Sequence, residues 1–442
     1  MVTARGKALE AITAVLEAGA YSNLALKQAT KNVSSTDAAL IKQLVYGTLT
    51  YRASLDYLLS QWLTRPLAKL QPAIRNVLRL GLYQIIYLQV PDHAAVDESV
   101  RLAHRVGHKG VAGLVNAVLR RAVRCKDDLP WPQTESATYN LSVRYSFPEW
   151  MIARWLERYG TEETRALCQA HNQVPGIDLR VNTLLNTQAE LLAELEAEGL
   201  EAEANRWVKN SVHLTAASLP HLSALAKGRC TVQGAASTLV GQVVDPQPGQ
   251  LVYDVCAAPG GKALHMAELM QNTGQVVALD IHSRRLGLIE KAAKRLQINS
   301  VNTRCIDATK LAEQGWEPAD CVLVDAPCSG LGVIRRKPDI RWQRQPADIR
   351  QLSALQIKIL QQAASLVKVG GVLVYSVCST EPEESSEIVD AFLQQQPAFE
   401  PLPWPEPLQA VWGAELEAGT LTTHPHRHGL DGFFIARLGR RR

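Results

Sequence analysis

Residues 251–262, LVYDVCAAPGGK, constrain the fold more than any other stretch of this chain. An apolar run ends at Asp254, a turn with Pro259, Gly260 and Gly261 follows, and a helical pattern begins at Lys262. A strand, a glycine turn and a helix in this order open a doubly wound α/β sheet, which binds ligands at the carboxyl ends of its strands.

The same alternation continues from residue 235 to the end of the chain. Further apolar runs predict a parallel sheet with helices on both faces, and a last strand over 432–438 at the far side. The expected strands cover 251–255, 275–280, 302–306, 320–325 and 371–377, and the expected helices cover 262–271, 283–297, 347–367 and 383–394.

The preceding residues predict two more layers. Residues 1–126 carry apolar residues at helical spacing almost throughout and predict an all-α domain, with helices opening at Pro72 and at Asp97. Residues 178–234 alternate in β-α-β-β-α-β order, which is typical of a small α+β, ferredoxin-like layer. We therefore expect a multidomain chain with an all-α domain (1–140), linker helices and a small α+β domain (141–234), and an α/β domain (235–442).

Charge is unevenly distributed along the chain. Residues 1–150 hold 18 Lys and Arg against 11 Asp and Glu, a net +7, whereas the remainder is −3. A basic domain beside a neutral one favours a polyanionic partner such as RNA. The basic residues that can contact phosphates are Arg75, Arg79, Arg101, Arg105, Lys109, Arg120, Arg121 and Arg124.

The eight cysteines and the chain start exclude other classes. No C-x-x-C pair is present, and the histidines of HPHRHG (424–429) lack neighbouring Cys or acidic ligands, so we predict no metal site. The amino-terminal segment has no unbroken apolar run, and no stretch is long enough to span a membrane, so we expect a cytoplasmic protein.

The loop at 254–262 selects among nucleotide-type ligands. It lacks the G-x-G-x-x-G fingerprint of a dehydrogenase, and Cys256 and Ala263 stand where a P-loop needs Gly and Ser or Thr. Asp280 ends the next strand and can accept both ribose hydroxyls, while Asp307 can reach an adenine amine; either can instead cap a helix. The arrangement favours S-adenosylmethionine.

Two cysteines follow strand ends, Cys328 in DAPCSG and Cys378 in YSVCST. A thiolate that adds to carbon 6 of a pyrimidine makes carbon 5 enamine-like, so that carbon 5 can take a methyl group from a sulfonium. This chemistry needs a thiol, a carboxylic acid near the base nitrogen and a group that assists release. Cys378, Cys328 and Asp325 can supply these functions, and the residues alone leave open which cysteine attacks.

These motifs resemble those of the RNA cytosine-5 methyltransferases of the Nol1/Nop2/Sun family. The stretch ALIKQLVYGTLTYRASLDYLL resembles a NusB-like RNA-binding domain, and the middle layer an RRM-like domain. The resemblance implies a Rossmann-like catalytic domain in which Cys378 is the nucleophile and Cys328 promotes product release. It implies S-adenosylmethionine contacts from Cys256, Ala257, Ala258, Pro259, Gly260, Gly261, Lys262, Asp280, Asp307 and Asp325.

For a bacterial member acting on small-subunit RNA, the resemblance implies methylation of one cytosine, cytosine-967 of 16S rRNA. We expect the protein to act as a monomer. The substrate would be the free RNA or an early assembly intermediate. The basic run 332–342, with Trp342, is expected to hold an RNA strand and stack a base. Two alternatives stay open: the same chemistry on tRNA or another RNA, and a mainly non-catalytic RNA-binding or assembly factor.

Overall fold

The computed structural model describes residues 3–88, 90–215 and 222–441. These divide into two compact units, of which unit 1 lies within Met1–Gln173 and Ile334–Gln343, and unit 2 within Val174–Val333 and Arg344–Arg442. The boundaries expected at residues 140 and 234 remain predictions. Among the described helices, none is both long and apolar enough to cross a membrane.

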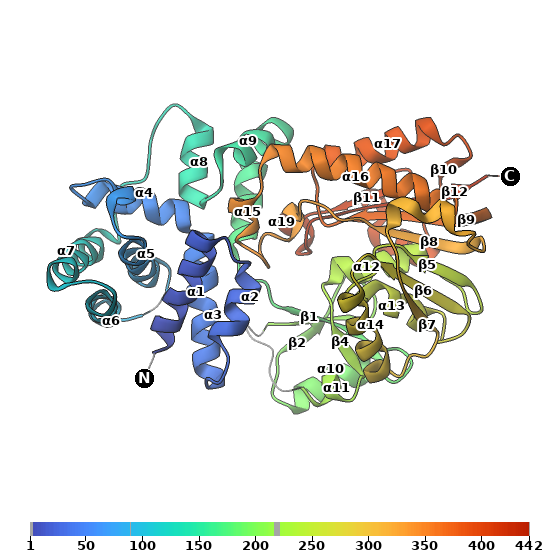
Figure 1. Cartoon of the computed structure of the whole chain (residues 1–442), viewed down its shortest axis with the longest axis horizontal. Coiled ribbons are helices and arrows are strands. Elements are labelled where there is room, and N and C mark those ends of the chain that lie inside the picture. The colour runs from blue at the N-terminus through green and yellow to red at the C-terminus, as the bar shows by residue number, and fades with distance from the viewer. Residues whose placement is uncertain (1–2, 89, 216–221, 442) are drawn as a thin grey trace. The chain divides into compact units, whose positions relative to one another are not determined.

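Unit 1 is all-α, as the helical spacing predicts (Figure 1). Its helices are α1 (Ala4–Ala18), α2 (Ser22–Ala29), α3 (Ser35–Thr50), α4 (Arg52–Trp62), α5 (Pro72–Tyr87), α6 (Asp92–Val106), α7 (Lys109–Cys125), α8 (Ala137–Tyr145), α9 (Glu149–Asn172) and α15 (Ile340–Gln343). Side-chain caps fix their starts: the hydroxyl of Ser34 accepts from the Asp37 amide, and Pro72 takes the first position of α5. The helix expected to open at Asp97 begins earlier, at Asp92.

Unit 2 contains two sheets. The smaller comprises β1 (Ile177–Val181), β2 (Ala202–Ala204), β3 (Ser211–Leu214) and β4 (Cys230–Val232), in the order β2-β3-β1-β4 with every pair antiparallel. The helices α10 (Gln188–Ala197) and α11 (Ser223–Ala226) connect the strands, so the β-α-β-β-α-β prediction is confirmed. The helix expected from His221 begins at Ser223, and His221 itself lies outside the described residues.

The larger sheet has the order β10-β12-β9-β8-β5-β6-β7, with β11 paired to β12. Its strands are β5 (Leu251–Asp254), β6 (Gln275–Asp280), β7 (Val301–Cys305), β8 (Ala319–Asp325), β9 (Val367–Val377), β10 (Phe399–Pro401), β11 (Thr420–Thr423) and β12 (Phe433–Arg440). The strands from β5 to β9 run parallel, as expected. The last strand, β12, lies beyond β9 as expected, and it pairs antiparallel with β9, β10 and β11, so the sheet is mixed.

Helices cover both faces of this sheet, and each face buries its own apolar core (Figure 1). One face carries α12 (Ala235–Val244), α13 (Gly261–Leu269) and α14 (Ser283–Leu296), and the other carries α16 (Pro346–Ala364) and α17 (Ser386–Gln395). Two sided burial explains why β5, β6 and β8 read as continuous apolar runs. Because β5 to β9 run parallel, the carboxyl ends of these five strands lie at one edge of the sheet.

Candidate active site

The two sequence-predicted cysteines meet at the carboxyl edge of the large sheet. Cys378 directly follows β9, Cys328 lies three residues after β8, and their sulfur atoms are 3.2 Å apart. The hydrogen bond to Cys378 is the largest cause that raises the pKa of the Cys328 thiol well above its usual range, and burial adds to it. The two thiols therefore share a hydrogen bond in which either sulfur can be the donor.

The loop that carries Cys328 is fixed by a residue that no motif singled out. Glu384 is fully buried, and its carboxylate accepts from the amide and the hydroxyl of Ser329 at 2.7 and 2.5 Å. The amide of Gln356 also donates to this carboxylate and to the carbonyl of Pro327. Glu384 therefore positions the loop that carries Cys328 by holding the next residue, Ser329. Its local sequence, PEES, does not indicate this role.

Asp325 lies beside the cysteines at the end of β8. Its carboxylate accepts from the Lys262 ammonium at 2.7 Å and from the Ser376 hydroxyl at 2.8 Å. Two donors from α13 and β9 fix the plane of this carboxylate, and Lys262 reaches it from the first turn of α13. The structure thus brings together Asp325, Lys262, Cys328 and Cys378, which are spread over more than a hundred residues of sequence.

The predicted ligand loop, Cys256–Lys262, forms a tight turn between β5 and α13. The Ala258–Pro259 bond is cis, and Gly260 has φ 102°, where a Cβ atom would lie 2.8 Å from Ile289. This close approach explains the glycine. The Ala258 amide donates to the Asp280 carboxylate at 3.2 Å, and this hydrogen bond links the loop to the end of β6.

Asp280 and Asp307, the two other predicted cofactor contacts, differ in their burial and in their hydrogen-bond partners. Asp280 is buried, accepts from the His282 amide at 2.9 Å and lies 3.6 Å from the Arg285 guanidinium. Asp307 caps the short 3₁₀ helix Ala308–Gln314, and its Oδ1 accepts from the amide and the hydroxyl of Thr309. These bonds lower the pKa of Asp307.

Asp254, at the end of β5, is the polar residue of the site that sequence reasoning passed over. It is fully buried, and its carboxylate oxygens lack a side-chain hydrogen-bond partner in the described part of the chain, while a backbone hydrogen bond from Cys256 lowers its pKa. Burial, and next the negative charge of Asp325, raise its pKa to about 7. Asp254 is identified as a site residue by its position at a strand end together with its complete burial. The sequence shows the strand end but not the burial.

This set of carboxylates fits the expected cofactor. Asp254, Asp280 and Asp325 interact electrostatically, with Lys262 among them as the opposing cation. S-adenosylmethionine carries a sulfonium and an ammonium, and a buried carboxylate without a partner is the group that such a cation would satisfy. Within the described ranges, no three His, Cys, Asp or Glu side chains gather in an arrangement able to hold a metal ion.

The basic residues predicted to contact RNA divide into buried and exposed groups. Arg341 is fully buried in unit 1, where it donates to the carbonyl of Ser146 and to the side chain of Asn172. The indole of Trp342 donates to the carbonyl of Leu49. The expectation that Arg341 contacts RNA is therefore wrong, because internal partners occupy its buried guanidinium, whereas base stacking on the half-buried ring of Trp342 stays a prediction.

The same correction applies to two arginines of α5. Arg79 is buried and bound to Asp56, and Arg75 pairs with Glu17. The exposed basic residues are Arg101, Arg105, Lys109, Arg120, Arg121 and Arg124 on α6 and α7. Of the arginines and lysines predicted to contact phosphates, these six stay exposed to solvent.

Family models of known proteins match each of the three predicted parts of the chain. The family model described as 16S rRNA methyltransferase RsmB/F matches residues 241–439, that of the NusB family matches 2–124, and that of the RsmF/B-like ferredoxin-like domain matches 147–219. The expected NusB-like, ferredoxin-like and methyltransferase layers are confirmed.

Relatives match over nearly the whole chain. A probable ribosomal RNA small subunit methyltransferase B of Bacillus subtilis is 40% identical over 98% of both chains. The ribosomal RNA small subunit methyltransferase B of Yersinia pseudotuberculosis is 36% identical, again over 98% of both. Among solved structures, PH0851 has a TM-score of 0.80 at 29% identity, covering 98% of each chain. The predicted resemblance to a bacterial methyltransferase that acts on small-subunit RNA is confirmed, and this chain belongs to the RsmB/F family of 16S rRNA methyltransferases.

Proposed function

We propose that this protein transfers a methyl group from S-adenosylmethionine to carbon 5 of a cytosine in 16S rRNA through a covalent bond to Cys378. The observation that carries the proposal is the pair of sulfur atoms 3.2 Å apart beside the Lys262–Asp325 pair. The names of the relatives support small-subunit rRNA as the substrate. The resemblance to RsmB points to cytosine-967.

The raised pKa of Cys328 supports the division of roles between the cysteines. A thiol that keeps its proton and hydrogen-bonds to a neighbouring sulfur stabilises that neighbour as a thiolate. Cys378 is then the nucleophile, and Cys328 can give its proton to the Cys378 sulfur as that sulfur leaves carbon 6.

The proposed reaction has two stages. The Cys378 thiolate adds to carbon 6, the Lys262–Asp325 pair supplies a proton to the base nitrogen, and the electron pair of the ring double bond becomes available at carbon 5. S-adenosylmethionine, when bound, supplies the methyl group. Transfer of that methyl group would leave the cofactor as S-adenosylhomocysteine. Carbon 5 then loses its proton to a general base, and the ring nitrogen returns its proton to the Lys262–Asp325 pair. The ring double bond forms again as the sulfur of Cys378 leaves carbon 6 and takes the proton of Cys328.

The target base must be exposed for this chemistry. Carbon 6 is shielded in a stacked helix, so the cytosine must be unpaired or turned out of the stack before the thiolate can reach it. The exposed basic side chains of α6 and α7 provide phosphate contacts that do not depend on sequence. RNA binding should accordingly weaken steeply with salt.

Trapping the covalent adduct tests the roles of both cysteines. Wild type, Cys378→Ser and Cys328→Ser are incubated with 16S rRNA and S-adenosylmethionine, and protein–RNA adducts that resist denaturation are separated on a gel. We expect Cys328→Ser to accumulate adduct and Cys378→Ser to form none. Cys125→Ser serves as a control, because Cys125 lies in unit 1 at the end of α7, outside the catalytic unit.

Each other outcome has a defined meaning. Adduct in Cys378→Ser alone would make Cys328 the nucleophile and reverse our assignment. Methyl transfer to tRNA but not to 16S rRNA would replace the substrate and keep the chemistry. RNA binding without adduct or methyl transfer by wild type would favour a non-catalytic RNA-binding or assembly factor.

A further inference from the structure

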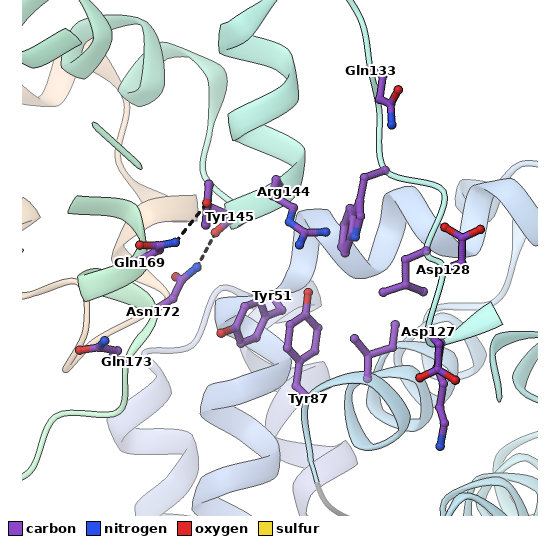
Figure 2. Close-up of a pocket in the computed structure, with 14 residues that line it drawn as sticks. Tyr51, Tyr87, Asp127, Asp128, Gln133, Arg144, Tyr145, Gln169, Asn172 and Gln173 are labelled. Carbon is purple, nitrogen blue, oxygen red and sulfur yellow. Dashed lines mark hydrogen bonds between the residues drawn. The ribbon is translucent and has the colours of Figure 1, made fainter. Parts of the chain in front are cut away.

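Unit 1 contains a large pocket that the methyl-transfer reaction does not use. Its volume is about 860 Å³, and its walls come from the start of α4, the end of α5, the connector after α7, α8 and the end of α9 (Figure 2). Pockets of this size accept small organic ligands and single nucleotides. All lining residues belong to unit 1.

Flat aromatic rings dominate one side of the pocket. Tyr51 and Tyr87 stack with their ring centroids 3.8 Å apart and an interplanar angle of 15° (Figure 2). Trp131 lies in the connector, and the Arg144 guanidinium covers its ring at 4.5 Å. Aromatic faces and guanidinium planes of this kind stack bases without regard to their identity.

The polar lining offers hydrogen bonds to the edge of a base. The side chains of Gln133 and Gln173 are exposed and make no hydrogen bond with the described part of the chain. Each amide presents both donors and acceptors. By contrast, the amide of Asn172 is occupied, since it donates to the Tyr145 carbonyl and accepts from Arg341.

The charges of the lining favour a base over a phosphate inside the pocket. Lys126 and Arg144 are balanced by Asp127 and Asp128, and Lys126 is already paired with Asp92 outside the pocket. A balanced lining gives no cradle for an anion. Exposed arginines stand on the last turns of α7, directly before the connector, where phosphates of a strand entering the pocket would find partners.

We propose that this pocket holds an unstacked nucleobase of single-stranded RNA, as an anchor apart from the base that is methylated. The inference rests on the proposed function, in that it takes RNA as the substrate. A base stacked there would be held by ring contact, and the arginines of α7 would hold the flanking phosphates. The pocket would then select unpaired RNA over duplex.

Binding of a labelled oligonucleotide tests the pocket in the full chain. The probe is a fluorescein-labelled single-stranded adenylate heptamer, compared with a duplex of the same length and with AMP. Trp131→Ala should weaken binding of the single strand by about tenfold or more, and Trp131→Phe should restore it because it keeps a ring. Tyr21→Ala is the matched control, since Tyr21 is an exposed aromatic of unit 1 outside the pocket.

The dependence on salt separates stacking from charge. Trp131→Ala should leave the slope of log affinity against log salt unchanged, whereas Arg124→Ala should reduce its magnitude by about one. Unchanged affinity of folded Trp131→Ala, as judged by circular dichroism, would overturn the proposal. Weakened AMP binding with unchanged heptamer binding would also overturn it, in favour of a free nucleotide. Methyl transfer by wild type, measured in parallel, tests the proposed function separately.

Discussion

Replacing Asp254 by asparagine should stabilise the ligand-free protein above neutral pH and weaken its binding of S-adenosylmethionine. Asp254 is fully buried without a side-chain hydrogen-bond partner in the described part of the chain, and its pKa rises from an ordinary 3.8 to about 7. An acid whose pKa is raised by folding destabilises the fold as it ionises. The penalty is absent below the unfolded pKa, grows as pH rises through this window and is complete above about 7.

The magnitude follows from the shift. At about 1.36 kcal/mol for each pH unit, a charged Asp254 costs on the order of 4 kcal/mol at pH 8 and on the order of 2 kcal/mol at pH 5. Asparagine removes the charge but adds a buried N–H donor, which costs about 1–2 kcal/mol. The net gain at pH 8 is about 2–3 kcal/mol, or a rise in melting temperature of roughly 5 °C or more.

Thermal unfolding at pH 5 and pH 8, with and without S-adenosylmethionine, measures both effects. Asp254→Asn should melt higher than wild type at pH 8, with a smaller difference at pH 5. Added ligand should raise the melting temperature of wild type more than that of the variant, because the variant lacks the carboxylate that pairs with the ligand cation. A variant that melts lower than wild type at pH 8 without ligand would refute the reasoning.

Two further substitutions probe buried cations. Arg180→Met should lower the free energy of unfolding in urea by about 3–5 kcal/mol, because it leaves the buried Glu268 carboxylate, 2.7 Å from the Arg180 guanidinium, without its cation. The double variant Arg180→Met, Glu268→Met should recover most of that stability. If the double variant is no more stable than the single one, the ion pair is not the cause. Arg341→Lys should destabilise unit 1 by about 1–3 kcal/mol, because its carbonyl acceptors lose partners. A change in the salt dependence of RNA binding would show that Arg341 contacts RNA after all.

Local patterns predicted much of the fold. The loop from Asp254 to Lys262 could be placed because strand, turn and helix follow one another within a dozen residues. The parallel order from β5 to β9 follows from repeated strand–helix units, which are also local. The direction of β12 could not be derived, because its partner β9 lies more than fifty residues away and the apolar run 432–438 is compatible with either direction.

The site residues divide in the same way. Cys328, Cys378 and Asp325 stand in short motifs beside strand ends, and the structure brings them together. Their roles in catalysis remain predictions. Glu384 escaped notice because its function depends on burial and on contact with Ser329, fifty-five residues away. Arg341 was misinterpreted for the same reason, since a basic run reads as exposed until its distant acceptors are known.

The segment Ile334–Gln343 gives unit 1 an unusual dependence on the order of synthesis. Nearly all of unit 1 is made first, but its Arg341 and Trp342 emerge only after about 160 residues of unit 2. Until then the carbonyls of Leu49 and Ser146 lack the hydrogen bonds that Trp342 and Arg341 donate to them. A nascent chain would therefore complete its first unit late, and a fragment cut after the NusB-like helices would never complete it.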